Sequence, residues 1–329
     1  QIVSYSSQQP PQYSRLPVIT SLDFSPDGKW LATAGFHEAV LVELGSRKIK
    51  HRLIGISPRI ESVRFSPDGT RLAVAGGRPG LSGEVQVWKV ATGELELSKL
   101  VGFDTIYGVS WSPDGTKIAF GSTDTNLRVI DAQTGEQVLF QGAHDDWVRE
   151  TAWSVDGSKL VSVGRDMTCK LVDFETERFI DNITSITPGA LKGGVLSVQR
   201  HPTKEEILVG GADGIPKIFR IFRNKARKIG DDFNLIRKFE ALQGRVYSVR
   251  FNKDGSQLVA GSSFNGKGMV SAFKEDGKKL WSLNLATSVY SVCYSPDGKT
   301  VAAAGADGHV RLIDVANGGL KTKFLPVKL

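Results

Sequence analysis

A short turn motif recurs along the chain and constrains its fold more than any other feature. An aromatic residue followed by Ser-Pro-Asp-Gly occurs at residues 24–28, 65–69, 111–115 and 294–298, and degenerate copies occur at 153–157 and 251–255. The aspartates of these copies are 41, 46, 42, 98 and 43 residues apart in chain order. The step of 98 has room for one more unit, whose decayed copy lies at 200–203. The sequence therefore contains seven repeat units of about 40 to 50 residues.

Each unit has the pattern of four short β-strands. An alternating apolar run leads into the Asp-Gly turn, as at 246–251, and a run of small residues follows it, as at 258–262. Two more apolar runs follow, such as 310–314 and 137–140, with turns between them. Asp-Gly between alternating runs favours a hairpin, because glycine accepts the positive φ that such turns require. Since no segment shows a sustained helical period, we predict an all-β fold, a seven-bladed β-propeller of four-stranded antiparallel blades.

The repeats divide the chain into an N-terminal extension, residues 1–16, and a propeller over residues 17–329. We expect the inner strands near 20–24, 62–65, 107–111, 149–153, 196–200, 247–251 and 290–294. Sheets packed around an axis bury both faces and leave only short outer edges. The ring must then close where the last unit meets the first. The last unit has its own fourth strand near 320–324. Residues 2–5 are an alternative strand that could take this place or add to it, and the sequence does not decide which strand closes the ring.

Composition narrows the possible functions. The chain has 42 basic and 35 acidic residues, a net charge of +7, and 40% hydrophobic residues, enough for a core. No apolar run approaches the roughly 18 residues that a membrane-spanning helix needs. Cys169 and Cys293 fall in distant units, so we expect two buried thiols and no disulfide. Because the first residue is Gln1, we expect the chain to be part of a longer or processed protein.

The sequence contains no catalytic or metal-binding constellation. Neither a Gly-x-Ser-x-Gly elbow nor a Cys-x-x-Cys-His motif occurs, and the five histidines are isolated from one another. Zinc needs three or four converging ligands, so we expect no catalytic residue, no metal and no cofactor. The alternative is a propeller enzyme with a catalytic or metal site in the central channel, for which only Glu61 supplies a carboxylate at the aligned inner-strand position. A purely structural spacer is a third option.

Aligned inner strands contain many residues of the types that bind partners. The position just inside each strand holds Thr20, Glu61, Tyr107, Arg149, Leu196, Tyr247 and Tyr290. Two residues earlier, the same alignment gives Arg59, Trp147 and Arg245 in three of the units. Tyrosine, tryptophan and arginine dominate binding hot spots. We therefore predict a channel-mouth face that binds a protein or peptide partner, formed by Arg59, Glu61, Tyr107, Trp147, Arg149, Arg245, Tyr247 and Tyr290.

Basic residues also cluster at 47–52 and 220–228 and near the end of the chain, at Lys321 and Lys323. The first and last groups fall on outer strands, where charge protects a sheet edge from aggregation. Nucleic-acid binding would need stacking aromatics interleaved with the basic residues on one surface, so we do not expect nucleic acid as a partner. Insertions at 78–83 and 224–234 should lengthen loops on the channel-mouth face and the opposite face, respectively.

The repeats resemble WD-repeat β-propellers from about residue 17 to residue 329. In place of the family's Trp-Asp signature, this sequence has Val172-Asp173, Ile130-Asp131, Ile313-Asp314 and Trp88-Lys89. The resemblance implies that the family's structural hydrogen-bond chain, which runs from a histidine through a serine to an aspartate, is formed by His144, Ser162 and Asp166. On this basis we expect a non-catalytic protein-interaction scaffold.

Two segments, residues 178–194 and 207–214, are similar to WD-repeat proteins of planctomycetes and verrucomicrobia. Such bacterial proteins are often fused to c-type cytochrome modules and lie outside the cytoplasm. The likeness implies that the chain is a module of a larger, exported or periplasmic bacterial protein, with the cytoplasm as the alternative. It also implies that a cytochrome-type module, which this chain does not contain, could belong to the same parent protein.

Overall fold

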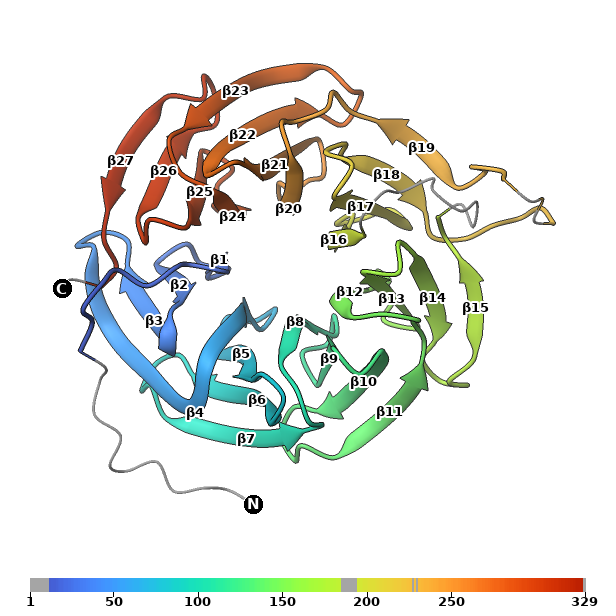
Figure 1. Cartoon of the computed structure of the whole chain (residues 1–329), viewed down its shortest axis with the longest axis horizontal. Coiled ribbons are helices and arrows are strands. Elements are labelled where there is room, and N and C mark those ends of the chain that lie inside the picture. Colours follow the sequence, from blue (N-terminus) through green and yellow to red (C-terminus); the bar gives the residue numbers. More distant parts are fainter. Residues whose placement is uncertain (1–11, 185–193, 227, 229, 328–329) are drawn as a thin grey trace.

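The sheets of the protein are arranged as a ring around a central axis (Figure 1). The structure is a computed structural model that describes residues 12–184, 194–226, 228 and 230–327. These residues form 27 β-strands, and no helix occurs among them. The predicted all-β class is therefore confirmed, as is the repeated four-stranded antiparallel sheet.

Five of the sheets contain four antiparallel strands each, and they correspond to the third to seventh repeat units. The third and fourth units contain β8 (Ile106–Trp111), β9 (Lys117–Ser122), β10 (Asn126–Asp131), β11 (Gln137–Gly142), β12 (Val148–Trp153), β13 (Lys159–Gly164), β14 (Cys169–Asp173) and β15 (Phe179–Asn182). The fifth and sixth contain β16 (Val195–Arg200), β17 (Glu206–Gly211), β18 (Lys217–Arg220), β19 (Leu235–Lys238), β20 (Arg245–Phe251), β21 (Gln257–Phe264), β22 (Lys267–Lys274) and β23 (Lys279–Leu285). The seventh contains β24 (Val289–Tyr294), β25 (Thr300–Gly305), β26 (Val310–Asp314) and β27 (Leu320–Phe324). In each unit the first strand lies nearest the axis (Figure 1).

The first two repeat units share one seven-stranded sheet, where the sequence predicts two separate sheets. Its strands are β1 (Leu22–Phe24), β2 (Trp30–Ala34), β3 (Phe36–Glu43), β4 (Lys48–Phe65), β5 (Arg71–Arg78), β6 (Ser82–Lys89) and β7 (Leu95–Val101). Strand β4 is 18 residues long and pairs with β3 along its first part and with β5 from Arg59 onward. Near the predicted boundary, the Ser57 backbone N–H and hydroxyl both donate to the buried Glu84 carboxylate, at 3.0 and 2.6 Å. The described residues therefore form six sheets.

The seven predicted inner segments are all strands that face the axis. They lie in β1, the last part of β4, β8, β12, β16, β20 and β24. The Asp-Gly turn within each clear copy of the motif has the predicted hydrogen bonds and glycine conformation. In the first turn Asp27 accepts hydrogen bonds from the Ser25 hydroxyl (2.6 Å) and the Lys29 N–H (3.0 Å), and Gly28 has a φ of 72°. Only glycine adopts this conformation without strain.

The proline of one motif also contacts the glycine of the next motif around the ring. A Cβ atom on Gly69 would lie 3.0 Å from Cδ of Pro26, and one on Gly157 would lie 3.2 Å from Cδ of Pro113. A side chain at either glycine would therefore press on the preceding turn. The motif is thus both a turn signal and a packing signal between neighbouring units.

A ring of hydrogen bonds, which we call the channel belt, links neighbouring inner strands. In six of the seven units, one side chain accepts a hydrogen bond from a backbone N–H of the next inner strand. Ser21 accepts from Val63 (3.1 Å), for example, and Ser248 accepts from Val292 (3.2 Å). The six acceptors, in chain order, are Ser21, Ser62, Glu150, Ser197, Ser248 and Ser291. Each of them lies one residue after the aligned inner-strand position.

Among the described residues, no strand is exchanged between the two ends of the ring. Strand β27 completes the sheet of the last unit, as one of the two predicted alternatives required, and residues 2–5 lie outside the described residues. The joint is made by the Leu22 N–H, which donates to Ser291 Oγ at 2.9 Å, and by the Ile19 N–H, which donates to the Gly305 carbonyl at 3.0 Å. A shared apolar cluster, which includes Leu31 and Cys293, packs behind these bonds.

Replacing Ser291 with alanine tests this closure. The substitution removes the acceptor of the buried Leu22 N–H and leaves that donor unsatisfied, so the free energy of unfolding should fall by about 1–3 kcal/mol. Urea unfolding followed by tryptophan fluorescence measures the change. Ser14→Ala is the control, because the Ser14 side chain is exposed and has no hydrogen bond within the described residues. Equal stability of the two variants would contradict a role of the channel belt in closing the ring.

Candidate functional site

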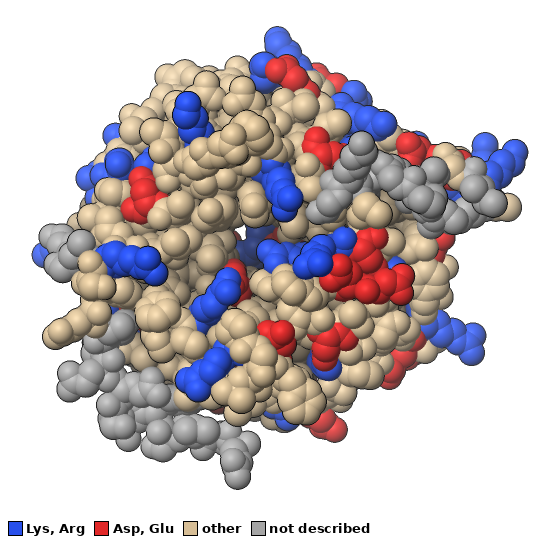
Figure 2. Space-filling view, in the orientation of Figure 1, with Lys and Arg blue, Asp and Glu red and all other residues tan. Residues whose placement is uncertain are grey.

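The aligned inner-strand position lines one cavity of about 380 Å³, which we call the upper cavity. All seven residues of that position contribute to it: Thr20, Glu61, Tyr107, Arg149, Leu196, Tyr247 and Tyr290. Its volume falls within the range of about 300–1,000 Å³ typical of ligand pockets. Its lining is mostly polar, with serine hydroxyls and arginine guanidinium groups. Figure 2 shows lysine and arginine side chains around the central opening of the ring.

The structure brings most of the predicted site residues together. Six of the eight, namely Arg59, Glu61, Tyr107, Arg149, Tyr247 and Tyr290, line the upper cavity. The other two, Trp147 and Arg245, lie at the starts of inner strands outside the lining, and Arg245 is exposed. The three tyrosines are half-buried, so their rings remain accessible to a ligand.

Aromatic and cationic side chains stack at one side of the upper cavity. The Tyr107 and Trp147 rings are stacked with their centroids 5.6 Å apart. The Arg149 guanidinium lies 3.9 Å from the centroid of Tyr107, and that of Arg165 lies 4.6 Å from the centroid of Trp147. Across the cavity, Tyr247 and Tyr290 meet edge to face at 5.2 Å. Such contacts hold the rings in place while leaving part of each surface free.

Glu61 forms an ion pair with Arg59, with 2.6 Å between the carboxylate and the guanidinium. Burial raises the pKa of Glu61, and the nearby Arg59 and Arg149 guanidinium groups oppose that rise. The Glu61 side chain is 9% exposed, whereas that of Arg59 is 53% exposed. The pair therefore places a buried carboxylate on the cavity wall and an exposed guanidinium at its rim.

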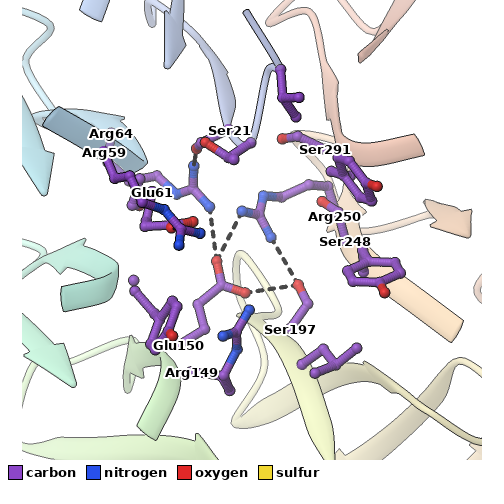
Figure 3. Close-up of a pocket in the computed structure, with 18 residues that line it drawn as sticks. Ser21, Arg59, Glu61, Arg64, Arg149, Glu150, Ser197, Ser248, Arg250 and Ser291 are labelled. Carbon is purple, nitrogen blue, oxygen red and sulfur yellow. Dashed lines mark hydrogen bonds and ion pairs between the residues drawn. The ribbon is translucent and has the colours of Figure 1, made fainter. Parts of the chain in front are cut away.

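A buried cluster of charges forms the floor of the upper cavity, and the sequence interpretation missed it. Glu150 accepts hydrogen bonds from Arg64 (2.8 Å) and Arg250 (3.0 Å), which come from two other units (Figure 3). Its other carboxylate oxygen accepts from the Ser197 hydroxyl (2.7 Å) and the Val198 N–H (2.9 Å). Burial raises the pKa of Glu150, and the Arg64 guanidinium and the Ser197 and Val198 hydrogen bonds oppose that rise.

One sequence signal could have identified Glu150. The position next to the aligned one holds serine in five units, but it holds Gly108 and Glu150 in the third and fourth. A Cβ atom on Gly108 would lie 2.6 Å from the Arg149 carbonyl and 2.9 Å from Cα of Glu150. The glycine therefore leaves room for the strand that carries the glutamate. No sequence pattern, however, indicates that two arginines converge on it.

A second cavity of about 370 Å³, the lower cavity, lies on the other side of this floor. Arg64, Glu150 and Arg250 line both cavities. Asp23 also lines the lower cavity and accepts a hydrogen bond from the Phe65 N–H at 2.8 Å. The three charged side chains thus divide the central channel into two compartments.

The remaining predicted residues are structural. His144 lies 3.0 Å from Asp166 and 2.8 Å from Ser162, so its Nδ1–H donates to the carboxylate and its Nε2 accepts from the hydroxyl. Burial would raise the pKa of Asp166, but hydrogen bonds from His144 and from the Asp145 and Thr168 N–H groups lower it to about 2. Cys169 and Cys293 are buried and unbridged, as predicted.

Exposed apolar side chains gather in loops on the same side as the predicted face. Phe36, Leu81 and Phe264 lie at the ends of hairpins that join second and third strands, and Phe103 precedes an inner strand. Phe103 is 87% exposed. The insertion at 78–83 lies beside this face, because the Gly80 N–H donates to Asp104 at 3.2 Å, just before β8. These four side chains come from four different loops and add exposed apolar groups to this face.

Two classes of feature are absent from the residues that the structure describes. No group of three or more histidine, cysteine, aspartate or glutamate side chains is placed to hold a metal ion. Likewise, none of the described segments is a helix long and apolar enough to cross a membrane.

Two protein families of WD repeats match most of the repeat units of this chain. The "WD domain, G-beta repeat" family matches residues 13–39, 47–89, 96–131, 135–173 and 233–269, which together exceed half of the chain. The "Anaphase-promoting complex subunit 4 WD40 domain" family matches residues 264–326.

Individual relatives are more distant and much longer than the segments they share with this chain. Periodic tryptophan protein 2 of Saccharomyces cerevisiae is 29% identical over 124 residues, which cover 38% of this chain and 12% of that protein. Its homolog in Neurospora crassa is 22% identical over 266 residues, covering 70% of this chain and 28% of the homolog. WD repeat-containing protein SL1-17 of Schistosoma mansoni is 38% identical over 81 residues, 24% of this chain and 26% of that protein. All three are eukaryotic proteins.

The lower cavity gives a testable pH dependence. Burial raises the pKa of Asp23 to about 6, although the Arg64 guanidinium opposes the rise. Because the folded chain holds this proton more tightly than the unfolded chain, the free energy of unfolding falls as the pH rises from about 4 to about 6. Asp23→Asn removes the titrating carboxyl group. The free energy of unfolding of the variant minus that of wild type should therefore increase by about 2 kcal/mol between pH 4 and pH 7. Urea unfolding at each pH measures it.

Asp27→Asn is the matched control. A hydrogen bond from Ser25 lowers the pKa of Asp27, so its titration is complete below about pH 5 and the variant should follow wild type above that pH. Parallel stability curves for Asp23→Asn and wild type would show that the folded state does not perturb the Asp23 carboxyl.

Proposed function

The chain belongs to the WD40 repeat family, and we propose that it acts as a non-catalytic scaffold that binds a protein or peptide partner at its channel-mouth face. The observation that supports this most strongly is the cavity in which six of the predicted residues meet, with three half-buried tyrosines on its wall. Interface hot spots are rich in tyrosine, tryptophan and arginine. The exposed Phe103 and its neighbouring loops extend this surface outward.

The mechanism that we propose is rigid presentation. The channel belt and the ring stacking fix the inner strands and the aromatic side chains before any partner arrives. A preorganised surface loses little conformational entropy on binding, so more of the contact energy appears as affinity.

The alternative, an enzyme that uses the channel, has less support. Two carboxylates, Glu61 and Glu150, do line the upper cavity, but both are engaged by arginines. A general acid or base needs a carboxyl group that can exchange a proton with a substrate. The four hydrogen bonds to Glu150 favour a fixed structural role instead.

We also propose that the ring counts as seven blades. Strand β4 then serves the first blade through its pairing with β3 and the second blade through its pairing with β5. The repeat register of the sequence and the channel belt support this count, since each inner strand supplies one position to the same ring.

The cellular setting that we propose rests on the resemblance alone. From the resemblance of residues 178–194 and 207–214 to bacterial WD-repeat proteins, we propose a periplasmic location and a cytochrome-type module elsewhere in the parent protein. Alkaline phosphatase fused to the full-length parent in a bacterial host tests this, because the enzyme needs disulfides that form outside the cytoplasm. Phosphatase activity is the expected result, and an inactive but intact fusion would support a cytoplasmic protein.

The binding surface is tested with peptides selected from a random phage-displayed library on the immobilised chain. We expect Trp147→Ala and Tyr247→Ala each to weaken the selected peptides about 30-fold, the effect of losing a hot-spot side chain worth about 2 kcal/mol. Phe179→Ala, on the outer strand β15, is the control and should change nothing. Peptides that bind both channel-mouth variants as tightly as wild type would contradict the proposed surface.

A further inference from the structure

We infer that the upper cavity receives an acidic segment of the partner, with a carboxylate of that segment bound by Arg149. This inference rests on the proposed function and adds the chemical class of the ligand. It depends on the balance of charge in the cavity, on the state of each arginine there, and on the size of the space.

The lining of the upper cavity has a surplus of positive charge. It includes four arginines and two glutamates, namely Arg59, Arg64, Arg149, Arg250, Glu61 and Glu150, for a net charge of +2. Charges inside a cavity with protein walls are screened less than charges on an open surface. An anionic ligand is therefore attracted to this cavity, and a cationic one is repelled.

Two of the four arginines are fully committed to the floor. One nitrogen of Arg64 donates to Glu150, and another donates to the Ser21 hydroxyl (2.9 Å) and the Val63 carbonyl (2.8 Å). Arg250 repeats this arrangement, donating to Glu150 and to the Val249 carbonyl at 2.7 Å. These guanidinium groups hold the floor together, so they are not the groups that capture a ligand.

Arg59, the third arginine, is paired with Glu61 at 2.6 Å. Arg149 is therefore the arginine of the lining that has no carboxylate partner at hydrogen-bond distance within the described residues. Within the described residues, its guanidinium has no hydrogen bond or ion pair, and its Nε is buried without a partner. The Tyr107 ring supports it from one side at 3.9 Å. A buried donor without an acceptor is costly, and a carboxylate is the acceptor that suits a guanidinium best, because two parallel hydrogen bonds can form. Figure 3 shows Arg149 beside Glu150 on the cavity wall.

The size and walls of the cavity favour a peptide segment over a small free anion. A volume of about 380 Å³ is much larger than a carboxylate or a phosphate alone requires. Half-buried tyrosine rings flank the cavity on two sides, and they can pack on the carbon atoms of a side chain that enters. An acidic side chain or a chain terminus would satisfy Arg149 while its neighbours cover the rings.

The experiment uses the peptides selected on the immobilised full chain, together with two charge variants. We expect the selected peptides to be enriched in aspartate and glutamate. Arg149→Gln should weaken the most enriched acidic peptide about tenfold or more, as expected for a lost charged hydrogen bond. Glu61→Gln removes a repulsive carboxylate and should strengthen the same peptide about two- to fivefold. Arg178→Gln is the matched control, since Arg178 is exposed and lies before β15, outside the cavity.

Fluorescence anisotropy measures each affinity, and equal melting temperatures of the variants establish that they are folded. The acidic peptide, its glutamine counterpart and inorganic phosphate are the probes, and the counterpart should bind at least tenfold more weakly. Two results would overturn this inference and leave the scaffold function intact. The peptides that lose affinity for Trp147→Ala could prove neutral or basic, or they could bind Arg149→Gln as tightly as wild type. Phosphate that competes as well as the acidic peptide would identify a free anion instead of a peptide. If no selected peptide loses affinity for Trp147→Ala or Tyr247→Ala, the result would count against both proposals.

Discussion

The architecture depends on hydrogen bonds that link neighbouring inner strands through one side-chain position, which supplies the acceptor in six of the seven units. An inner strand has backbone N–H groups along its edge, and those that its own sheet does not use are buried against the neighbouring unit. A serine at this position supplies the acceptor, as Ser197 does for Val249 at 3.2 Å. Because a buried N–H without a partner costs about 1–3 kcal/mol, the belt favours one angular arrangement of the units. Its last bond, from Leu22 to Ser291, joins the two ends of the ring.

One departure from the serine pattern gives the channel its chemistry. Glu150 keeps the belt bond, to Val198, but its longer side chain also reaches Arg64 and Arg250. Buried ion pairs add little net stability, since desolvation offsets the attraction, but removing one partner leaves an uncompensated charge. The cluster therefore fixes the geometry of the channel more than it stabilises the fold. It separates the two cavities and engages Arg64 and Arg250, whereas Arg149 keeps a buried Nε without a hydrogen-bond partner.

The two faces of the ring differ in what they can bind. The Asp-Gly turns on one face use their polar side chains for internal hydrogen bonds, as Asp27 does with Ser25 and Lys29. The channel-mouth face instead presents half-buried tyrosines, the exposed Phe103 and a cavity with surplus positive charge. A partner that combines apolar and acidic groups fits that face on both counts.

The sequence by itself determined the number of repeat units, the position of each inner strand and the residues that share the aligned position, because these depend on local turn chemistry and strand period. The resemblance to WD-repeat propellers implied the hydrogen-bond chain of His144, Ser162 and Asp166, which the structure places in contact. Only the tertiary structure decided that β4 runs through the first boundary and that Glu150 meets two arginines 86 and 100 residues away in the chain. Contacts across the channel depend on how the closed ring aligns strands that are distant in sequence, and no local sequence pattern predicts which of these strands meet. The same closure sets which tyrosines remain accessible and raises the pKa of Asp23 through burial.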